Sequence, residues 1–180
     1  MAHIHTNPGE HDLTTSAFVV RDDLETPKLL LHMHKKLHVL LQPGGHVELR
    51  EDPWQAITHE LKEESGYALE ELEILQPKGA LRQVTNAKLH PVPVVVNTHN
   101  FDDEGTHKHT DISFAFLAHD APKSQPEEGE SNDIRWLSLE ELSALDSSEI
   151  FENVREIGKY VLTHVYQGWE RFDATRVSSV

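Results

Sequence analysis

Cysteine is absent from this chain of 180 residues. Its absence excludes disulfide bonds, thiolate zinc sites and cysteine nucleophiles, although it does not identify a cellular compartment. Apolar runs as long as a membrane span are also missing, and residues 1–12 lack the apolar core of a signal peptide. We therefore expect a cytoplasmic protein that has no membrane as a partner.

Basic residues are few, because 16 Lys and Arg stand against 31 Asp and Glu, which gives a formal net charge of −15. The basic residues are scattered along the sequence, so a nucleic-acid duplex or an anionic membrane would be repelled. The same acidity is compatible with carboxylates that bind hard divalent cations.

Histidine is abundant, with 14 residues, and three pairs have two-residue spacing. On a strand, both members of such a pair lie on one face and could hold a transition metal. We favour the simpler interpretation, which is scattered, solvated histidines. The pairs are His3/His5, His32/His34 and His107/His109.

The length suits a single domain, and the 37% of hydrophobic residues is enough for one core. We expect a flexible lead-in at 1–12, one domain at 13–166 and a C-terminal tail at 167–180. Strands are predicted by β-branched content and short apolar runs at 14–20, 28–34, 37–42, 72–84, 93–98, 111–119 and 134–137. Loops are predicted at 100–108 and 122–132, and helices at 53–65, 139–145 and 148–166. These elements indicate an α/β protein with a mixed β-sheet between helices.

The helix at 53–65 has clear end signals. Asp52 is a plausible N-cap, Pro53 suits the first helical position, and Gly66 is a plausible C-cap.

Three carboxylates share one side of this helix. At about 100° per residue, Glu60, Glu63 and Glu64 fall within an arc of roughly 100°, beside the apolar stripe that contains Ile57 and Leu61. Like charges at these spacings cost about 0.2–0.5 kcal/mol each, and a bound divalent cation would reverse that penalty. Taken alone, the pattern fits an acidic, solvated helix equally well.

The residues around the helix resemble the Nudix box. Seven positions match the family pattern at fixed spacing, and chance agreement is on the order of 10⁻⁸ at about 7% per position. They are Gly45, Glu51, Glu60, Leu61, Glu63, Glu64 and Gly66. Residues 29–48 and 134–142 also look like the segments that precede the box and close the domain in this family. The resemblance implies a Nudix-type α/β/α sandwich with a mixed β-sheet.

Two box positions depart from the family pattern. His59 stands where the family has arginine, and Tyr67 stands where an aliphatic residue is usual. The family arginine typically pairs with the first box glutamate, here Glu51. Histidine is shorter and is charged only when protonated, so activity should be lower or more sensitive to pH while metal binding survives. Glu51, His59 and Gly66 are thus the expected supports of the box.

The resemblance also implies an activity. It is the hydrolysis of a diphosphate (P–O–P) linkage in a nucleoside diphosphate linked to another moiety, such as a nucleotide or a nucleotide sugar, with Mg²⁺ as cofactor or Mn²⁺ as its substitute. Glu60, Glu64 and the carbonyl of Gly45 would bind the metal, and Glu63 would bind a further ion. These three glutamates are also the expected catalytic residues.

The general base and the substrate contacts are less well defined by the sequence. Glu63 is the first choice for the base, and Glu130 on a distant loop is the second. His46 and Glu48 follow the glycines directly and are candidates for contact with substrate or metal, or for bracing the loop.

Three other functions are compatible with parts of the sequence. A non-catalytic Nudix domain that binds or senses a nucleotide metabolite is disfavoured by the intact box glutamates. A histidine-based transition-metal protein would differ in its metal preference. A prenyl diphosphate isomerase of the same broad family is disfavoured by the lack of cysteine. The substrate stays undefined, and so does the oligomeric state, although family members are often homodimers.

Overall fold

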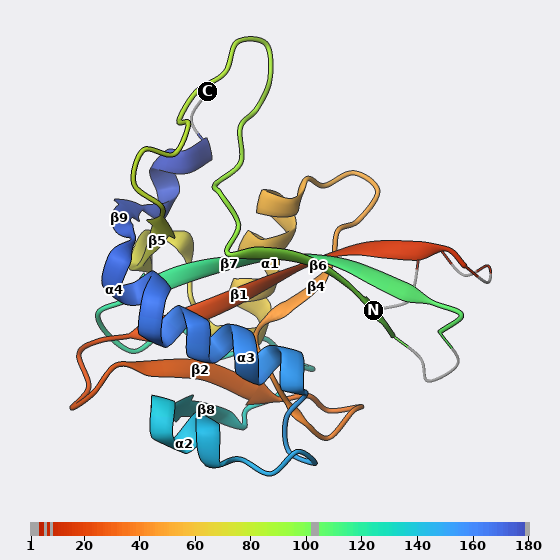
Figure 1. The fold of residues 1–180 in the computed structure, drawn as a ribbon, viewed down its shortest axis with the longest axis vertical. Coiled ribbons are helices and arrows are strands. Elements are labelled where there is room, and N and C mark those ends of the chain that lie inside the picture. The colour runs from red at the N-terminus through yellow and green to blue at the C-terminus, as the bar shows by residue number, and fades with distance from the viewer. Residues whose placement is uncertain (1–3, 6, 8, 102–104, 179–180) are drawn as a thin grey trace.

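The computed structural model describes residues 4–5, 7, 9–101 and 105–178, and Figure 1 shows their arrangement. Within these residues the chain forms a nine-stranded mixed sheet with the strand order β3-β2-β1-β7-β5-β9, to which β4, β6 and β8 are added at the sides. The two central strands, β1 (His11–Arg21) and β7 (Lys108–Ala118), run parallel through eleven residue pairs, and the other pairings are antiparallel. The remaining strands are β2 (Lys28–Met33), β3 (Leu40–Leu41), β4 (Gly44–His46), β5 (Leu72–Gln76), β6 (Val95–Asn100), β8 (Ile134–Leu137) and β9 (Glu170–Asp173).

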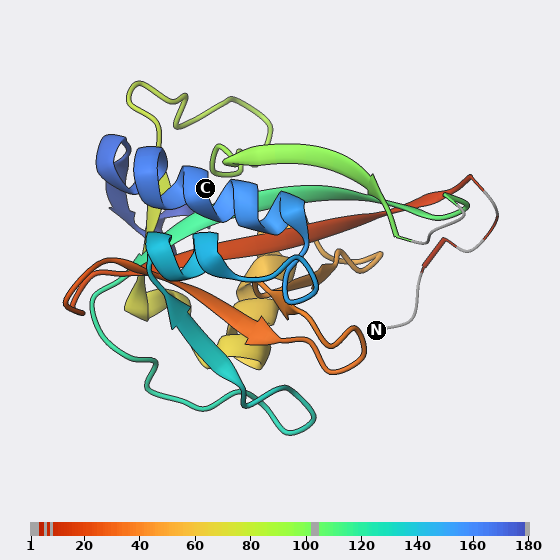
Figure 2. The ribbon, with the colours of Figure 1, turned by 60° about the horizontal axis from the view of Figure 1, so that its bottom comes forward.

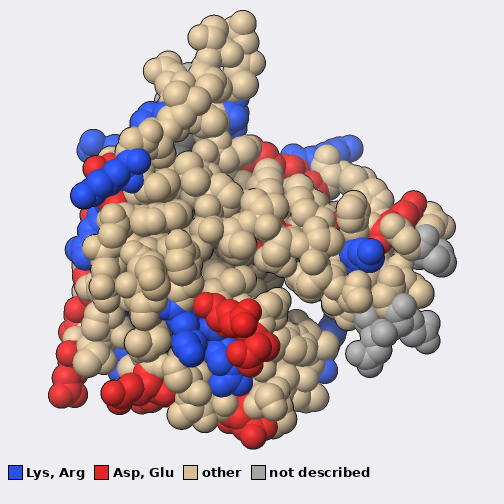
Figure 3. Space-filling model, viewed as in Figure 1, with Lys and Arg blue, Asp and Glu red and all other residues tan. Residues whose placement is uncertain are grey.

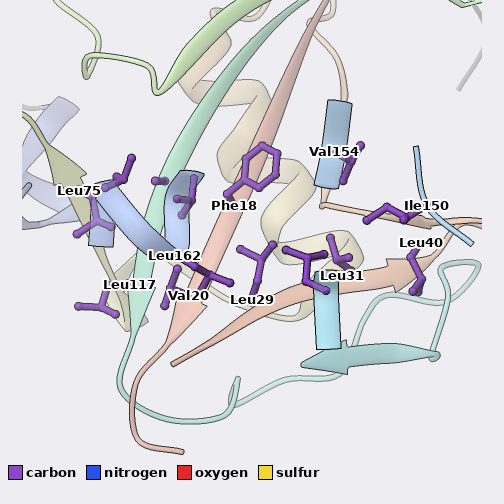
Figure 4. Close-up of a cluster of buried hydrophobic side chains, with 14 residues drawn as sticks. Phe18, Val20, Leu29, Leu31, Leu40, Leu75, Leu117, Ile150, Val154 and Leu162 are labelled. Atoms are coloured by element: carbon purple, nitrogen blue, oxygen red, sulfur yellow. The ribbon is translucent and has the colours of Figure 1, made fainter. Parts of the chain in front are cut away.

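Helices cover both faces of this sheet. The side chains of Phe18 and Val20 on β1 pack in the core cluster that includes α2 (Leu139–Ala144), α3 (Glu152–Tyr160) and the π-helix that continues α3 to Val165. Figure 4 shows this cluster. Ala17 and Val19 point to the opposite face, as strand alternation requires, and pack with α1 (Pro53–Ser65). Figure 2 shows the sheet between α1 on one side and α3 on the other. The expected α/β/α sandwich is confirmed.

Helix α1 begins and ends where the sequence predicts. The Asp52 carboxylate accepts hydrogen bonds from the backbone N–H groups of Trp54 (3.0 Å) and Gln55 (2.9 Å), and the Gln55 side chain accepts one from the backbone of Asp52 (3.0 Å). This reciprocal capping box satisfies donors that a helix start leaves open. Gly66 ends the helix in the left-handed region at φ 80°.

Several predicted elements are shorter than expected because distant segments compete for them. The strand predicted at 72–84 ends at Gln76, whose buried side chain accepts a hydrogen bond from the N–H of Val92 (2.8 Å) and donates to its carbonyl (3.1 Å). The helix predicted from residue 148 begins at Glu152, because the carbonyl of Glu149 accepts a hydrogen bond from the N–H of Leu40 in β3 (2.7 Å). Ile150 then forms an isolated parallel bridge with Leu40.

Other differences lie near the two ends of the chain. Strand β9 pairs with β5 in the region that the sequence analysis assigned to a tail, and β1 already begins at His11. Residues 1–3, 6 and 8 of the lead-in, 102–104 of the predicted loop at 100–108, and 179–180 of the tail lie outside the described residues. His3 of the pair His3/His5 is among them.

Gly66 should be the box glycine on which stability depends most. Its φ of 80° disfavours a side chain, and a Cβ there would overlap the backbone carbonyl of Ser124. Gly79 has a similar φ of 72° but has open space around its Cα, so it is a matched control. We expect Gly79→Ala to cost about 1 kcal/mol and Gly66→Ala at least about 2 kcal/mol. Urea denaturation checks this, and equal losses would contradict a role for the contact with Ser124.

Candidate active site

The three acidic side chains of α1 lie at the edge of the core. Glu60 is 4% and Glu64 is 8% exposed, whereas Glu63 is partly buried and Lys62 points to solvent. The placement agrees with the helical arc that the sequence predicts, in which the carboxylates flank the apolar stripe.

Glu64 contacts the first glycine of β4 directly. The backbone N–H of Gly44 donates a hydrogen bond to Glu64 Oε2 (2.8 Å). Gly44 can approach so closely because β4 packs against β1, where a Cβ on Gly44 would overlap the carbonyl of Thr15. Gly45 is the next residue of β4, so its backbone lies beside the same carboxylate. His32 Nε2 on β2 lies 3.5 Å from Glu64 Oε2.

Burial makes these carboxylates weak acids. It raises the pKa of Glu64 to about 8, with Glu60, Glu130 and Glu63 adding to the effect and the Gly44 N–H opposing it. Burial, and next Glu63, raises the pKa of Glu60 to about 7. The imidazole of His32 brings no positive charge, because burial lowers its pKa to about 4. A cation at this position would allow both glutamates to ionise.

The loop between β7 and β8 reaches the same site. The N–H of Glu127 donates to the carbonyl of Glu63 (2.8 Å), and Lys35 Nζ donates to the carbonyl of Gly129 (2.5 Å). Glu130 on this loop raises the pKa of both Glu60 and Glu64 through its charge. The structure therefore brings this distant carboxylate into the electrostatic neighbourhood of the box.

His59 connects two box glutamates at the surface. Its Nε2 lies 2.6 Å from Glu63 Oε1, and its Nδ1 lies 3.5 Å from Glu51 Oε1. Burial lowers the pKa of His59, but the charges of Glu63 and Glu51 outweigh burial, so the net pKa is raised. A protonated His59 can thus serve two carboxylates at once.

None of the contacts above joins the candidates Glu48 and His46 to Glu60, Glu63 or Glu64. The Glu48 side chain is exposed, and its carbonyl accepts a turn hydrogen bond from Glu51 (2.9 Å). His46 Nε2 lies 3.3 Å from Asp12 Oδ2, and its ring packs edge-on against His109. The expectation that the histidines are solvated is therefore wrong for His32, His46 and His109, which are all buried.

Sequence reasoning missed His32 and Asp12. The only signal for His32 was its alternation with the buried Leu30 on β2, which places both side chains on the α1 side of the sheet. Asp12 carried no signal, because its neighbours come from β4 and from the start of β7.

The surface shows no broad field of one charge on the face drawn in Figure 3, where basic and acidic side chains lie beside one another. Among the described residues, none of the helices has the length and apolar character needed to cross a bilayer.

Comparisons with known proteins identify the class to which this fold and site belong. The family model of the NUDIX domain matches residues 10–156. A solved structure of a NUDIX-family hydrolase from Clostridium perfringens is 29% identical, with a TM-score of 0.69, over 85% of this chain and 97% of that one. No curated protein matches.

Two further solved structures share the fold at lower identity. A UDP-X diphosphatase is 19% identical, with a TM-score of 0.57, over 88% of this chain and 64% of that one. The NUDIX domain of NrtR from Shewanella oneidensis, complexed with ADP ribose, is 16% identical, with a TM-score of 0.55, over 83% of this chain and 86% of that one.

The chain belongs to the Nudix family. Within it, the chain is a Nudix hydrolase, a pyrophosphohydrolase that acts on phosphorus-containing anhydrides.

The raised pKa values predict an unusual dependence of stability on pH. Burial raises the pKa of Glu60 and Glu64 from the ordinary value of 4.5 to about 7 and about 8 in the folded protein. Between these limits the folded state binds more protons than the unfolded state, so the free energy of unfolding falls as pH rises from about 5 to 8 without divalent ions. We expect a loss on the order of a few kcal/mol.

Urea denaturation of the metal-free protein at several pH values measures this loss. Glu64→Gln should be more stable than the parent chain at pH 8 and similar to it at pH 5, because the amide carries no charge. Glu70→Gln, at an exposed position, is the control and should follow the parent at both pH values. The same pH profile for both variants would refute the assignment.

Proposed function

We propose that this hydrolase depends on a divalent metal ion and cleaves the P–O–P linkage of a nucleoside diphosphate linked to another moiety, such as a nucleotide or a nucleotide sugar. The observation that carries the proposal is a pair of buried glutamates, Glu60 and Glu64, beside the N–H of Gly44 in β4. His32 Nε2, 3.5 Å from Glu64 Oε2, carries no positive charge there, because burial lowers its pKa to about 4. A bound cation would allow both carboxylates to ionise at neutral pH.

Glu60, Glu64 and the carbonyl of Gly45 would hold Mg²⁺, or Mn²⁺ in its place, and Glu63 would hold a further ion directly or through water. All of these ligands are oxygens, which is the donor type that both ions prefer. When bound, such ions lower the pKa of an attacking water and stabilise charge on the phosphates. The Gly44 N–H orients Glu64, and His59 orients Glu63 and Glu51.

The proposed general base is Glu63, with Glu130 as the second choice. His59 Nε2 lies 2.6 Å from Glu63 Oε1 and holds that carboxylate in position. Glu130 lies on the loop between β7 and β8, close enough for its charge to raise the pKa of Glu64 and Glu60. Comparison of Glu63→Gln with Glu130→Gln separates the two, because only the base should lose its limb of the pH–rate profile.

The substrate class is in keeping with structural relatives that act on UDP-X or bind ADP ribose. Those likenesses are below 25% identity and support the fold alone, so the substrate remains our proposal. We also propose a cytoplasmic location and assembly as a homodimer. The proposed partner is a small-molecule nucleotide rather than a nucleic-acid duplex or a membrane.

Glu64→Gln should lower magnesium-dependent turnover by about 100-fold or more, because it removes a metal ligand at the reacting phosphates. Phosphate release is measured over a panel that contains ADP-ribose, nucleotide sugars, dinucleoside polyphosphates and nucleoside triphosphates. Glu128→Gln, on the exposed loop, is the control and should keep normal turnover. Undiminished turnover in Glu64→Gln would refute the metal assignment, and binding of a nucleotide without turnover would favour a sensor.

His59→Arg should preserve or raise turnover by a few-fold, because arginine keeps its charge and can pair with both carboxylates. The difference should grow as pH rises, since the raised pKa of His59 means that its positive charge is lost at higher pH. His59→Ala should lower turnover at every pH. Rates between pH 6 and 9 check this, and a large loss in His59→Arg would exclude the supporting role.

A further inference from the structure

A second group of metal-ligating side chains lies outside the box, where three segments meet. Asp12 is near the start of β1, His109 is near the start of β7 and His107 directly precedes it. The parallel register pairs Asp12 with His109, so their side chains lie side by side on one face. His46, at the end of β4, pairs with Thr14 and reaches the same place.

This histidine–aspartate cluster faces away from α1. Asp12, Thr14 and Ser16 share one face of β1 with Phe18, whose core cluster contains α2 and α3, whereas Ala17 belongs with α1. Its ligands are therefore distinct from Glu60, Glu63 and Glu64.

The distances within the cluster fit a metal ion better than direct ion pairs. Asp12 Oδ2 lies 3.3 Å from His46 Nε2 and 3.3 Å from His107 Nε2, and Asp12, His107 and His109 each offer a ligand atom within 4.8 Å of the others. Charge-assisted hydrogen bonds are shorter, at about 2.7–2.9 Å. Ligand atoms around a tetrahedral zinc ion with bonds of about 2.0–2.1 Å are separated by about 3.3–3.4 Å.

Burial and charge also favour a cation in the cluster. The Asp12 side chain is fully buried, and the side chains of His46 and His107 are 10% and 12% exposed. A buried carboxylate needs a compensating positive charge. The nearby buried Asp111 accepts hydrogen bonds from the hydroxyl groups of Thr14 (3.0 Å), Ser16 (2.9 Å) and Ser113 (2.6 Å).

The neighbours of the cluster orient its ligands. The backbone N–H groups of His5 and Ile4 donate to Asp12 Oδ1 (2.8 Å) and Oδ2 (3.2 Å). The ring of Phe101 packs at 4.8 Å from that of His109 and shelters the site with an apolar surface. Hydrogen bonds to a ligating carboxylate and an apolar surround are common around metal sites.

We propose that Asp12, His107 and His109 form a site for a transition-metal ion of the Zn²⁺ type, with His46 at its border. Imidazole nitrogens with one carboxylate suit zinc, whereas magnesium prefers oxygen ligands only. The ion would join the starts of β1 and β7 on the face that points away from α1, apart from the box glutamates.

The test measures metal binding in a variant whose Nudix box lacks the carboxylates of Glu60 and Glu64. Full-length Glu60→Gln/Glu64→Gln protein is stripped with a chelator and titrated with Zn²⁺ by calorimetry and with Co²⁺ by visible absorption. We expect about one ion per chain, an intense tetrahedral Co²⁺ spectrum and a higher Tm in the presence of Zn²⁺. Because no substrate or magnesium is used, the result is independent of the proposed hydrolysis.

Ligand variants in the same background identify the site. His107→Ala/His109→Ala should weaken Zn²⁺ binding at least about 100-fold and abolish the Co²⁺ spectrum. The control variants His11→Ala and His164→Ala remove exposed histidines. They should leave the affinity for Zn²⁺ and the Co²⁺ spectrum unchanged. Asp12→Asn keeps an acceptor for the backbone donors and serves if the double variant fails to fold. Unchanged Zn²⁺ binding in Asp12→Asn or in the double variant would overturn the proposal. So would a starting protein that binds no Zn²⁺, and the residues would then form a histidine–aspartate cluster without a metal ion.

Discussion

The candidate active site depends on two carboxylates that are buried on the same side of one helix turn. Glu60 and Glu64 are removed from water and repel one another, and the pKa values of about 7 and 8 measure how strongly the fold resists their charges. Without a cation, protons would neutralise them. The Asp52 cap and the Gly66 end fix the bounds of α1, which sets the rotational position of both side chains. The proposed cation would therefore complete the site and stabilise the fold at the same time.

Two glycines allow three separate segments to pack around Glu60 and Glu64. Gly44 lets β4 approach β1 closely enough for its N–H to reach Glu64, and Gly66 lets the loop carrying Ser124 pass over the end of α1. The same loop carries Glu130, so the packing that terminates the helix also brings a third carboxylate to the site. A side chain at either glycine would disturb the site without touching a ligand.

Features encoded by local sequence were predictable, whereas features set by distant partners were not. The N-cap, the C-cap and the acidic arc of α1 follow from residues within about four helical turns of each other, and the spacing of the box then identified the family. Strand β9 was missed because its alternating half-buried residues gain their strand only by pairing with β5. The contact of His32 with Glu64 and the neighbours of Asp12 likewise join segments that the sequence separates by tens of residues.

The three residues of β4 link two sites of opposite chemical preference. Gly44 and Gly45 border an all-oxygen group on the α1 side, and His46 points to a nitrogen-rich group around Asp12. Hard oxygen ligands favour magnesium, and imidazoles favour zinc, so the proposed ions would not compete for the same ligands. Each group contains a buried carboxylate, and the proposed ions would add positive charge beside it. The different donor atoms would then determine which ion binds at each position.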